Sequence, residues 1–156
     1  MTFRIQGLVR QAFQPLIGQP DHVLARHRAR RQVADASPGY PDRITLDDVP
    51  VGESVLLVHH EHQSADTPFR ASHAIFVWEH APATWDRLDE IPPALARRLI
   101  SLRAFDAAHM MIDADIAPGE SLRNPIERFF ANTQVAYLHA HYAKWGCYAA
   151  RVDRAS

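Results

Sequence analysis

The stretch VAYLHAHYAKWGCYAARVD, residues 135–153, decides the fold predicted for this chain. Both of its halves alternate between apolar residues and other residues, which is the period-two pattern of a half-buried β-strand. We therefore predict strands over Val135–Ala143 and Cys147–Asp153. The loop Lys144-Trp145-Gly146 joins them, with its glycine in the left-handed conformation that such loops use. The chain thus has a C-terminal β-hairpin.

The length of this loop decides which side chains share a face of the hairpin, because a slip of one residue turns every side chain to the other face. With a three-residue loop, the apolar residues of both strands face one core. His139, His141, Cys147 and Arg151 then lie together on the opposite face, with His139 opposite Arg151 and His141 opposite Ala149. A loop of two or four residues would separate Cys147 from both histidines.

Four interpretations of that face are open. It is a polar surface that meets water, or a pocket in which Arg151 and the imidazoles bind a carboxylate or phosphate. It is a metal site, because a His-x-His pair on a strand directs both rings to one side, and His62, His139 and His141 are the candidate ligands. Alternatively, Cys147 is a nucleophile activated by His141, and these two are the candidate catalytic residues.

The rest of the chain shows both strand and helix patterns. Further strands are predicted over residues 3–8, 43–49, 54–62, 73–79 and 110–116. Helices are predicted over 10–17, 22–30 and 124–132, and from Pro92 onward, where Leu95, Leu99 and Leu102 form one apolar stripe. We therefore expect a single globular domain over residues 1–156. Its class is α+β, with three to four helices packed on one face of a mostly antiparallel mixed sheet.

Composition narrows the classes of partner. The chain is 47% hydrophobic and 22% charged, with a net charge of -1, so neither a nucleic-acid partner nor a membrane is expected. Arg26, Arg28, Arg30 and Arg31 are interpreted as a solvated helix end, where cations face the negative end of the dipole. Cys147 is the only cysteine and the start shows no secretory pattern, so we expect a cytoplasmic location. The oligomeric state is left open.

Three stretches resemble a bacterial family of uncharacterised proteins, the domain of unknown function DUF1203. They are EHQ at residues 61–63, TPFRASHAIFV at 67–77, and HAH…GCYAAR within 139–151. The resemblance runs nearly from end to end of the chain, and the third stretch is its most specific part. The family carries no assigned activity, so the resemblance implies no function. It does direct attention to Glu61, His62, Arg70, His73, His139, His141, Cys147 and Arg151.

The leading functional hypothesis is a domain that binds a small anionic ligand in a polar cleft. The loop carrying Arg70 and His73 and the face of the last hairpin would form this cleft. Its ligand-binding candidates are Glu61, His62, Arg70, His73, His139, His141 and Arg151. One alternative is an enzyme on the His139-x-His141…Cys147 face, either a hydrolase with a divalent metal or a Cys/His enzyme. Another is a protein-interaction module that exposes Trp78 and Trp85.

Overall fold

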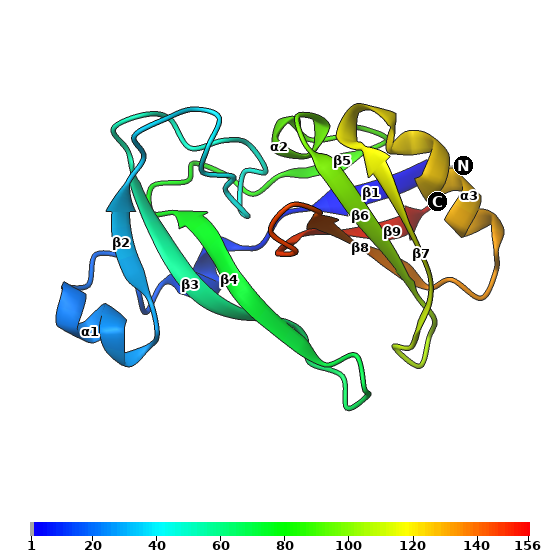
Figure 1. Ribbon diagram of the computed structural model, residues 1–156, viewed down its shortest axis with the longest axis horizontal. Coiled ribbons are helices and arrows are strands. Elements are labelled where there is room, and N and C mark those ends of the chain that lie inside the picture. The colour runs from blue at the N-terminus through cyan, green and yellow to red at the C-terminus, as the bar shows by residue number, and fades with distance from the viewer. Residues whose placement is uncertain (1) are drawn as a thin grey trace.

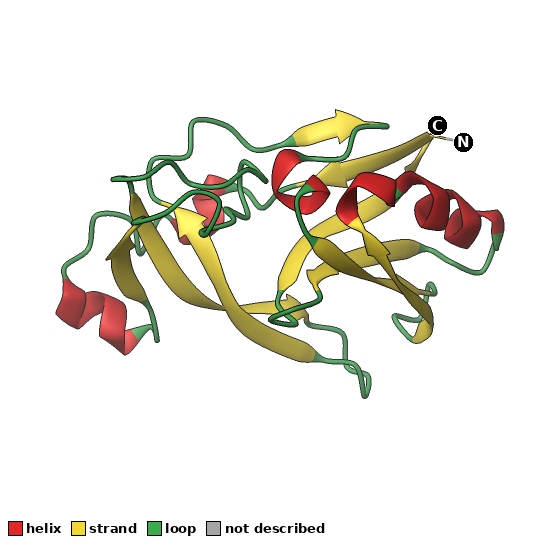
Figure 2. Cartoon of the chain, turned by 45° about the horizontal axis from the view of Figure 1, so that its top comes forward, coloured by secondary structure: helices red, strands yellow, loops and turns green. Residues whose placement is uncertain are grey.

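The computed structural model describes residues 2–156, and β-structure dominates it (Figure 2). Within these residues, sheet A has six strands in the order β5-β1-β9-β8-β6-β7, and sheet B has three in the order β2-β3-β4. Neighbouring strands in both sheets are antiparallel. The strands are β1 (Thr2–Gln6), β2 (Arg30–Val33), β3 (Ser54–Gln63), β4 (Ala71–Trp78), β5 (Asp86–Leu88), β6 (Leu99–Phe105), β7 (Met111–Pro118), β8 (Tyr137–Tyr142) and β9 (Tyr148–Ala155).

The described residues contain only three short α-helices, so the expected α+β arrangement with three to four helices packed on one sheet face is wrong. The helices are α1 (Asp21–Arg26), α2 (Pro93–Ala96) and α3 (Arg123–Ala131), with 3-10 turns η1 (Arg10–Phe13) and η2 (Gly119–Ser121). Helix α3 buries Ile126, Phe129 and Phe130, which have helical spacing, in the core of sheet A. The protein is therefore mostly antiparallel β-structure.

The main error in the predicted helices concerns the leucine stripe after Pro92. Helix α2 ends at Ala96, and residues Leu99–Phe105 form strand β6. Ile100, Leu102 and Ala104 are buried in alternation, whereas Leu99 is 51% exposed. The period of two therefore describes this segment, and the helical spacing of its leucines is coincidental.

The predicted strand over 43–49 is likewise wrong, because turns and isolated bridges occupy it.

Figure 1 shows the two sheets side by side along the long axis of the molecule, with both chain ends near α3. One hydrophobic core lies between sheet A and the helices α2 and α3, and includes Leu102, Leu138 and Phe130. A second core, which includes Leu24 and Leu56, brings α1 together with sheet B. The last residues of β3 therefore lead from the second core toward the face of sheet A that the helices leave uncovered.

The C-terminal hairpin forms as predicted, but its loop is one residue longer. The Tyr142 N–H donates to the Cys147 carbonyl over 2.9 Å, and the Gly146 N–H donates to the Tyr142 carbonyl over 2.7 Å, which leaves the four residues 143–146 in the loop. Gly146 has a φ of 77°, the left-handed conformation expected of it. His139 is opposite Arg151 as predicted, whereas His141 is opposite Tyr148 rather than Ala149.

Candidate functional site

Two β-bulges shape the region where sheet B meets sheet A. On β3, Glu61 pairs with Ser72 and Gln63 with Ala71, so the register shifts at His62. On β9, Ala150 pairs with Ala140 and Tyr148 with His141, so the register shifts at Ala149. A bulge places two residues opposite one and changes the direction of the side chains beside it. The two bulges direct the rings of His62, from sheet B, and Tyr148, from sheet A, against each other where the sheets meet.

Three imidazoles meet in this contact, and we call His62, His139 and His141 the histidine cluster. The ring centres of His62 and His141 are 4.9 Å apart, and His139 lies 6.1 Å from His62 and 6.3 Å from His141. The ring of Tyr148 stacks on His62 at 5.4 Å with an angle of 10° between the planes. Phe105 closes the cluster on the other side, 4.9 Å from His139. The alternation in the sequence assigns Tyr148 to the core and so misses it as a neighbour.

The cluster is buried, and its ring nitrogens are not all satisfied. His139 is 4% exposed and His141 is 1% exposed. His141 Nδ1 lies 3.0 Å from the Gly146 carbonyl, and because a carbonyl only accepts, this nitrogen carries the proton. Nε2 of neutral His141 is then an acceptor, and it has no partner among residues 2–156. His62 Nδ1 and His139 Nδ1 are also buried without a partner there. Buried polar atoms without partners mark a site that another group can complete.

The three histidines are neutral at physiological pH. Burial lowers the pKa of His139 and of His141 to about 3, and that of His62 to about 4. The nearby guanidinium of Arg103 lowers the pKa of all three further, because two positive charges repel each other. The cluster therefore offers uncharged donors and acceptors beside a fixed positive charge.

A basic row crosses sheet A beside the cluster, and we define it as Arg103, His139 and Arg151. The register places Arg103 on β6 directly opposite His139 on β8, and His139 opposite Arg151 on β9. Side chains directly opposite each other on neighbouring strands are close enough to interact. Arg151 lies over the Tyr137 ring at 4.0 Å and also pairs with Asp153.

Arg103 differs from Arg151 because it has no acidic partner. Its one hydrogen bond goes from Nε to Ser101 Oγ over 3.4 Å, and no ion pair to it forms within residues 2–156. The side chain is half-buried, and burial lowers the pKa of its guanidinium. A partly desolvated cation without a counter-charge is unfavourable for stability. The sequence pattern misses Arg103, because the leucine spacing assigns this segment to a helix.

The remaining candidate residues lie at the margin of the cluster or apart from it. Glu61 and Arg70 are paired with each other, Arg70 Nε to Glu61 Oε2 over 3.1 Å, and both are exposed. His73 is opposite His60 on the β3–β4 pair, and its Nδ1 lies 2.9 Å from the Ala74 carbonyl. Glu61 and Arg70 therefore neutralise each other's charge, and the histidine cluster and the basic row remain as the candidate site.

Cys147 does not lie with the histidines. The four-residue loop places it opposite Tyr142, on the side of the hairpin that belongs to the core of sheet A. Its sulfur accepts a hydrogen bond of 3.0 Å from Nη2 of Arg43, a fully buried side chain that also donates to the Tyr148 carbonyl. The predicted shared face of Cys147 and His141 is therefore wrong, since a residue beyond the bulge follows the opposite alternation.

We expect the native protein to resist alkylation at Cys147. The thiol is only 7% exposed and sits behind Arg43, so reaction with iodoacetamide at pH 7.5 should be at least ten times slower than in urea. Intact-mass spectrometry after timed quenching measures both rates. Equal rates in buffer and in urea would contradict the placement of this side chain in the core.

The two tryptophans expected to form an interaction surface are partly buried instead. Trp78 Nε1 donates to Glu53 Oε1 over 3.1 Å, and Trp85 packs against the core of sheet A. The exposed tryptophan is Trp145, at the tip of the last hairpin. The packing therefore does not favour an interaction module built on Trp78 and Trp85, because both side chains are partly buried.

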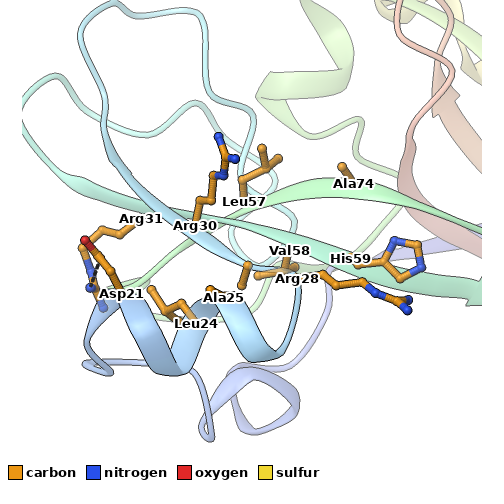
Figure 3. A pocket seen from close by; sticks show the side chains of 11 residues that line it. Asp21, Leu24, Ala25, Arg28, Arg30, Arg31, Leu57, Val58, His59 and Ala74 are labelled. Atoms are coloured by element: carbon orange, nitrogen blue, oxygen red, sulfur yellow. Dashed lines mark ion pairs between the residues drawn. The ribbon is translucent and has the colours of Figure 1, made fainter.

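One cavity of about 670 Å³ lies away from the histidine cluster, beside α1 and the start of β2 (Figure 3). Leu24, Ala25, Leu57, Val58 and Ala74 give it an apolar lining. The charged and polar side chains that line it are those of Asp21, Arg28, Arg30, Arg31 and His59. The sequence alone indicates a solvated helix end for these arginines. The stretch Arg28-Ala29-Arg30, where helix α1 is followed by strand β2, is the sequence feature that could have identified these arginines.

Together, the fold and the cluster define a two-sheet antiparallel β-protein with buried histidines where the sheets meet. The chain belongs to the family described as protein of unknown function (DUF1203), whose family model matches residues 39–154 of the 156-residue chain. The comparison with curated proteins and the comparison with solved structures gave no match. No helix formed by residues 2–156 has the length and apolar character needed to cross a membrane.

Proposed function

We propose that this protein binds a small oxyanion, such as a phosphate or carboxylate group, at the basic row beside the histidine cluster. The observation that carries the proposal is Arg103, which is half-buried and has no acidic partner within residues 2–156. A bound oxyanion supplies the missing counter-charge. A planar guanidinium suits this task because it donates two parallel hydrogen bonds to a carboxylate or phosphate.

The histidines support the same ligand class. A protonated oxyanion, such as dihydrogen phosphate, donates its O–H to an imidazole nitrogen while its other oxygens accept from Arg103. Nε2 of His141 is an acceptor of this kind, buried and without a partner among residues 2–156. An anion beside His139 also raises the pKa of that ring, because opposite charges stabilise each other. The cluster therefore selects anions that can share a proton.

A metal ion fits the present arrangement of the rings less well. Three imidazoles on one tetrahedral zinc ion, with Zn–N bonds of about 2 Å, place their ring centres about 5 Å apart. His139 lies 6.1 Å and 6.3 Å from the other two rings. Within residues 2–156, no three His, Cys, Asp or Glu side chains are arranged to hold a metal ion. Metal binding would require a ring to move first, because His139 is too far from the other two rings.

Thermal melts with phosphate test this proposal. At a phosphate concentration ten times Kd, the bound state is stabilised by about 1.4 kcal/mol, which raises Tm by about 3–5 °C for a chain of this size. The comparison is made at constant ionic strength with sodium chloride. In Arg103→Gln, we expect the phosphate effect to vanish and Tm without phosphate to stay equal or rise, since a desolvated cation has been removed.

The matched control is Arg87→Gln. Arg87 is exposed and pairs with Glu90 outside the row, so this variant should keep the full phosphate response. An equal response in Arg103→Gln and in the native protein would overturn the proposal. Metal analysis of the same preparations covers the enzyme alternative. Stoichiometric zinc that disappears in His62→Ala would favour the metal site instead.

A further inference from the structure

The cavity beside α1 combines an apolar floor with positive charge at its rim. Leu57 and Val58 of β3 and Ala25 of α1 lie between the charged side chains (Figure 3). Figure 3 shows Arg28 and His59 near each other at one end and Arg30 at another. The volume of about 670 Å³ is in the range of small-molecule sites. This site is separate from the histidine cluster, since none of the cluster or basic-row residues lines it.

The two rim arginines are free to bind a ligand. Neither Arg28 nor Arg30 forms an ion pair or a side-chain hydrogen bond with any residue from 2 to 156. The third arginine of the lining, Arg31, is engaged with Glu79 and lies 3.8 Å from Asp21. The net charge of the whole chain is only -1. The two unpaired guanidinium groups therefore give this cavity a positive charge that the protein as a whole does not have.

The backbone at Arg28 is left-handed. Helix α1 ends with a hydrogen bond of 2.9 Å from the Ala29 N–H to the Leu24 carbonyl, and Arg28 has a φ of 56°. This left-handed position after a helix is the one that glycine favours, because it has no Cβ. Arg28 therefore occupies a backbone conformation that costs an arginine more than a glycine, and replacement by glycine should not strain the backbone.

We propose that this cavity binds an anionic amphiphile, a molecule with a carboxylate or phosphate head and an apolar chain or ring. The head pairs with Arg28, and the apolar part covers Leu57, Val58 and Ala25. Removal of this apolar surface from water favours binding, and the guanidinium selects an anionic head over a cationic one. The proposal goes beyond the oxyanion site, because the two sites share no residue.

Isothermal titration calorimetry with decanoate, below its micelle concentration, tests the proposal. We expect saturable binding of one decanoate per chain and no binding of decyltrimethylammonium, which has an alkyl tail of nearly the same length and the opposite charge. In Arg28→Gly, affinity should fall at least tenfold while Tm stays equal or rises, because glycine relaxes the left-handed position. Arg30→Gln should weaken binding as well.

Two control variants distinguish binding in this cavity from binding elsewhere on the protein. Arg26→Gln removes an exposed arginine that does not line the cavity, and it should bind decanoate like the native protein. Arg103→Gln should also bind it normally, so failure at one site is distinguishable from failure at the other. Equal affinity of Arg28→Gly and the native protein, equal binding of the cationic amphiphile, or binding to anionic vesicles without binding of free decanoate would each overturn the proposal.

Discussion

His139 and His141 are together expected to destabilise this protein by about 4 kcal/mol when the pH is lowered from 7.5 to 5, before most carboxylates begin to titrate. Burial holds the pKa of His139 and of His141 at about 3, whereas an unfolded histidine has a pKa of 6.5. Because the folded pKa is the lower one, the unfolded state binds more protons below pH 6.5. Each of these two histidines then removes about 2 kcal/mol at pH 5. A protein with about 5–15 kcal/mol of total stability would approach unfolding there.

Urea melts at pH 7.5, 6.5, 5.5 and 5.0 measure this loss. The decline should begin near pH 6.5 and continue toward pH 3, and His62, with a pKa lowered to about 4, adds to it. His139→Phe removes one of the titrating groups, so its stability should fall by about 2 kcal/mol less over the same range. The exposed His22 provides the control, since His22→Gln should keep the native dependence. If the unfolding free energy of His139→Phe fell with pH as steeply as that of the native protein, the histidine cluster would not be the cause of the loss.

Replacement of Glu79 by alanine is expected to cost about 2–3 kcal/mol of unfolding free energy, because water can reach part of the Arg31 side chain that loses its partner. The side chain is 4% exposed and accepts hydrogen bonds from Arg31 Nε over 2.6 Å, from the Gly18 N–H over 2.9 Å and from Ser54 Oγ. Burial alone would raise the pKa of this carboxyl, but the bonds from Arg31, Ser54 and Gly18 outweigh burial and hold its pKa at about 2. Alanine leaves the Arg31 guanidinium and the Gly18 N–H without this partner.

The measurement is urea unfolding of Glu79→Ala beside Glu90→Ala. Glu90 pairs with Arg87 on the surface, where ion pairs contribute about 0–1 kcal/mol, so Glu90→Ala should be nearly neutral. Similar losses of unfolding free energy in both variants would contradict the stabilising role of the hydrogen bonds to Glu79. Because Arg31 of β2 lines the cavity beside α1 and Gly18 belongs to the loop before α1, Glu79→Ala should also loosen the wall of that cavity.

Local alternation in the sequence predicted the elements where one face is buried and the strand is regular. The hairpin, β3, β4 and β7 all lie close to the expected ranges. The pairing of His139 with Arg151 is also as predicted, although the predicted loop is one residue too short, because the bulge at Ala149 offsets the extra loop residue. The same reasoning failed at Leu95, Leu99 and Leu102, since three leucines at helical spacing also fit a strand whose alternate residues are buried. Only the position of the core chooses between these two periods.

The sequence by itself determined that His139 and His141 share a face of the last hairpin, because side chains two residues apart on a regular strand point to the same side. Arg151 lies on that face because the four-residue loop and the bulge at Ala149 together set the pairing of the two strands. The tertiary structure alone decided that His62 and Tyr148 join them and that Cys147 does not. The physical reason is that a β-bulge costs only one unpaired residue locally, so no pattern in the chain marks it. Its position follows from how two curved sheets must fit together.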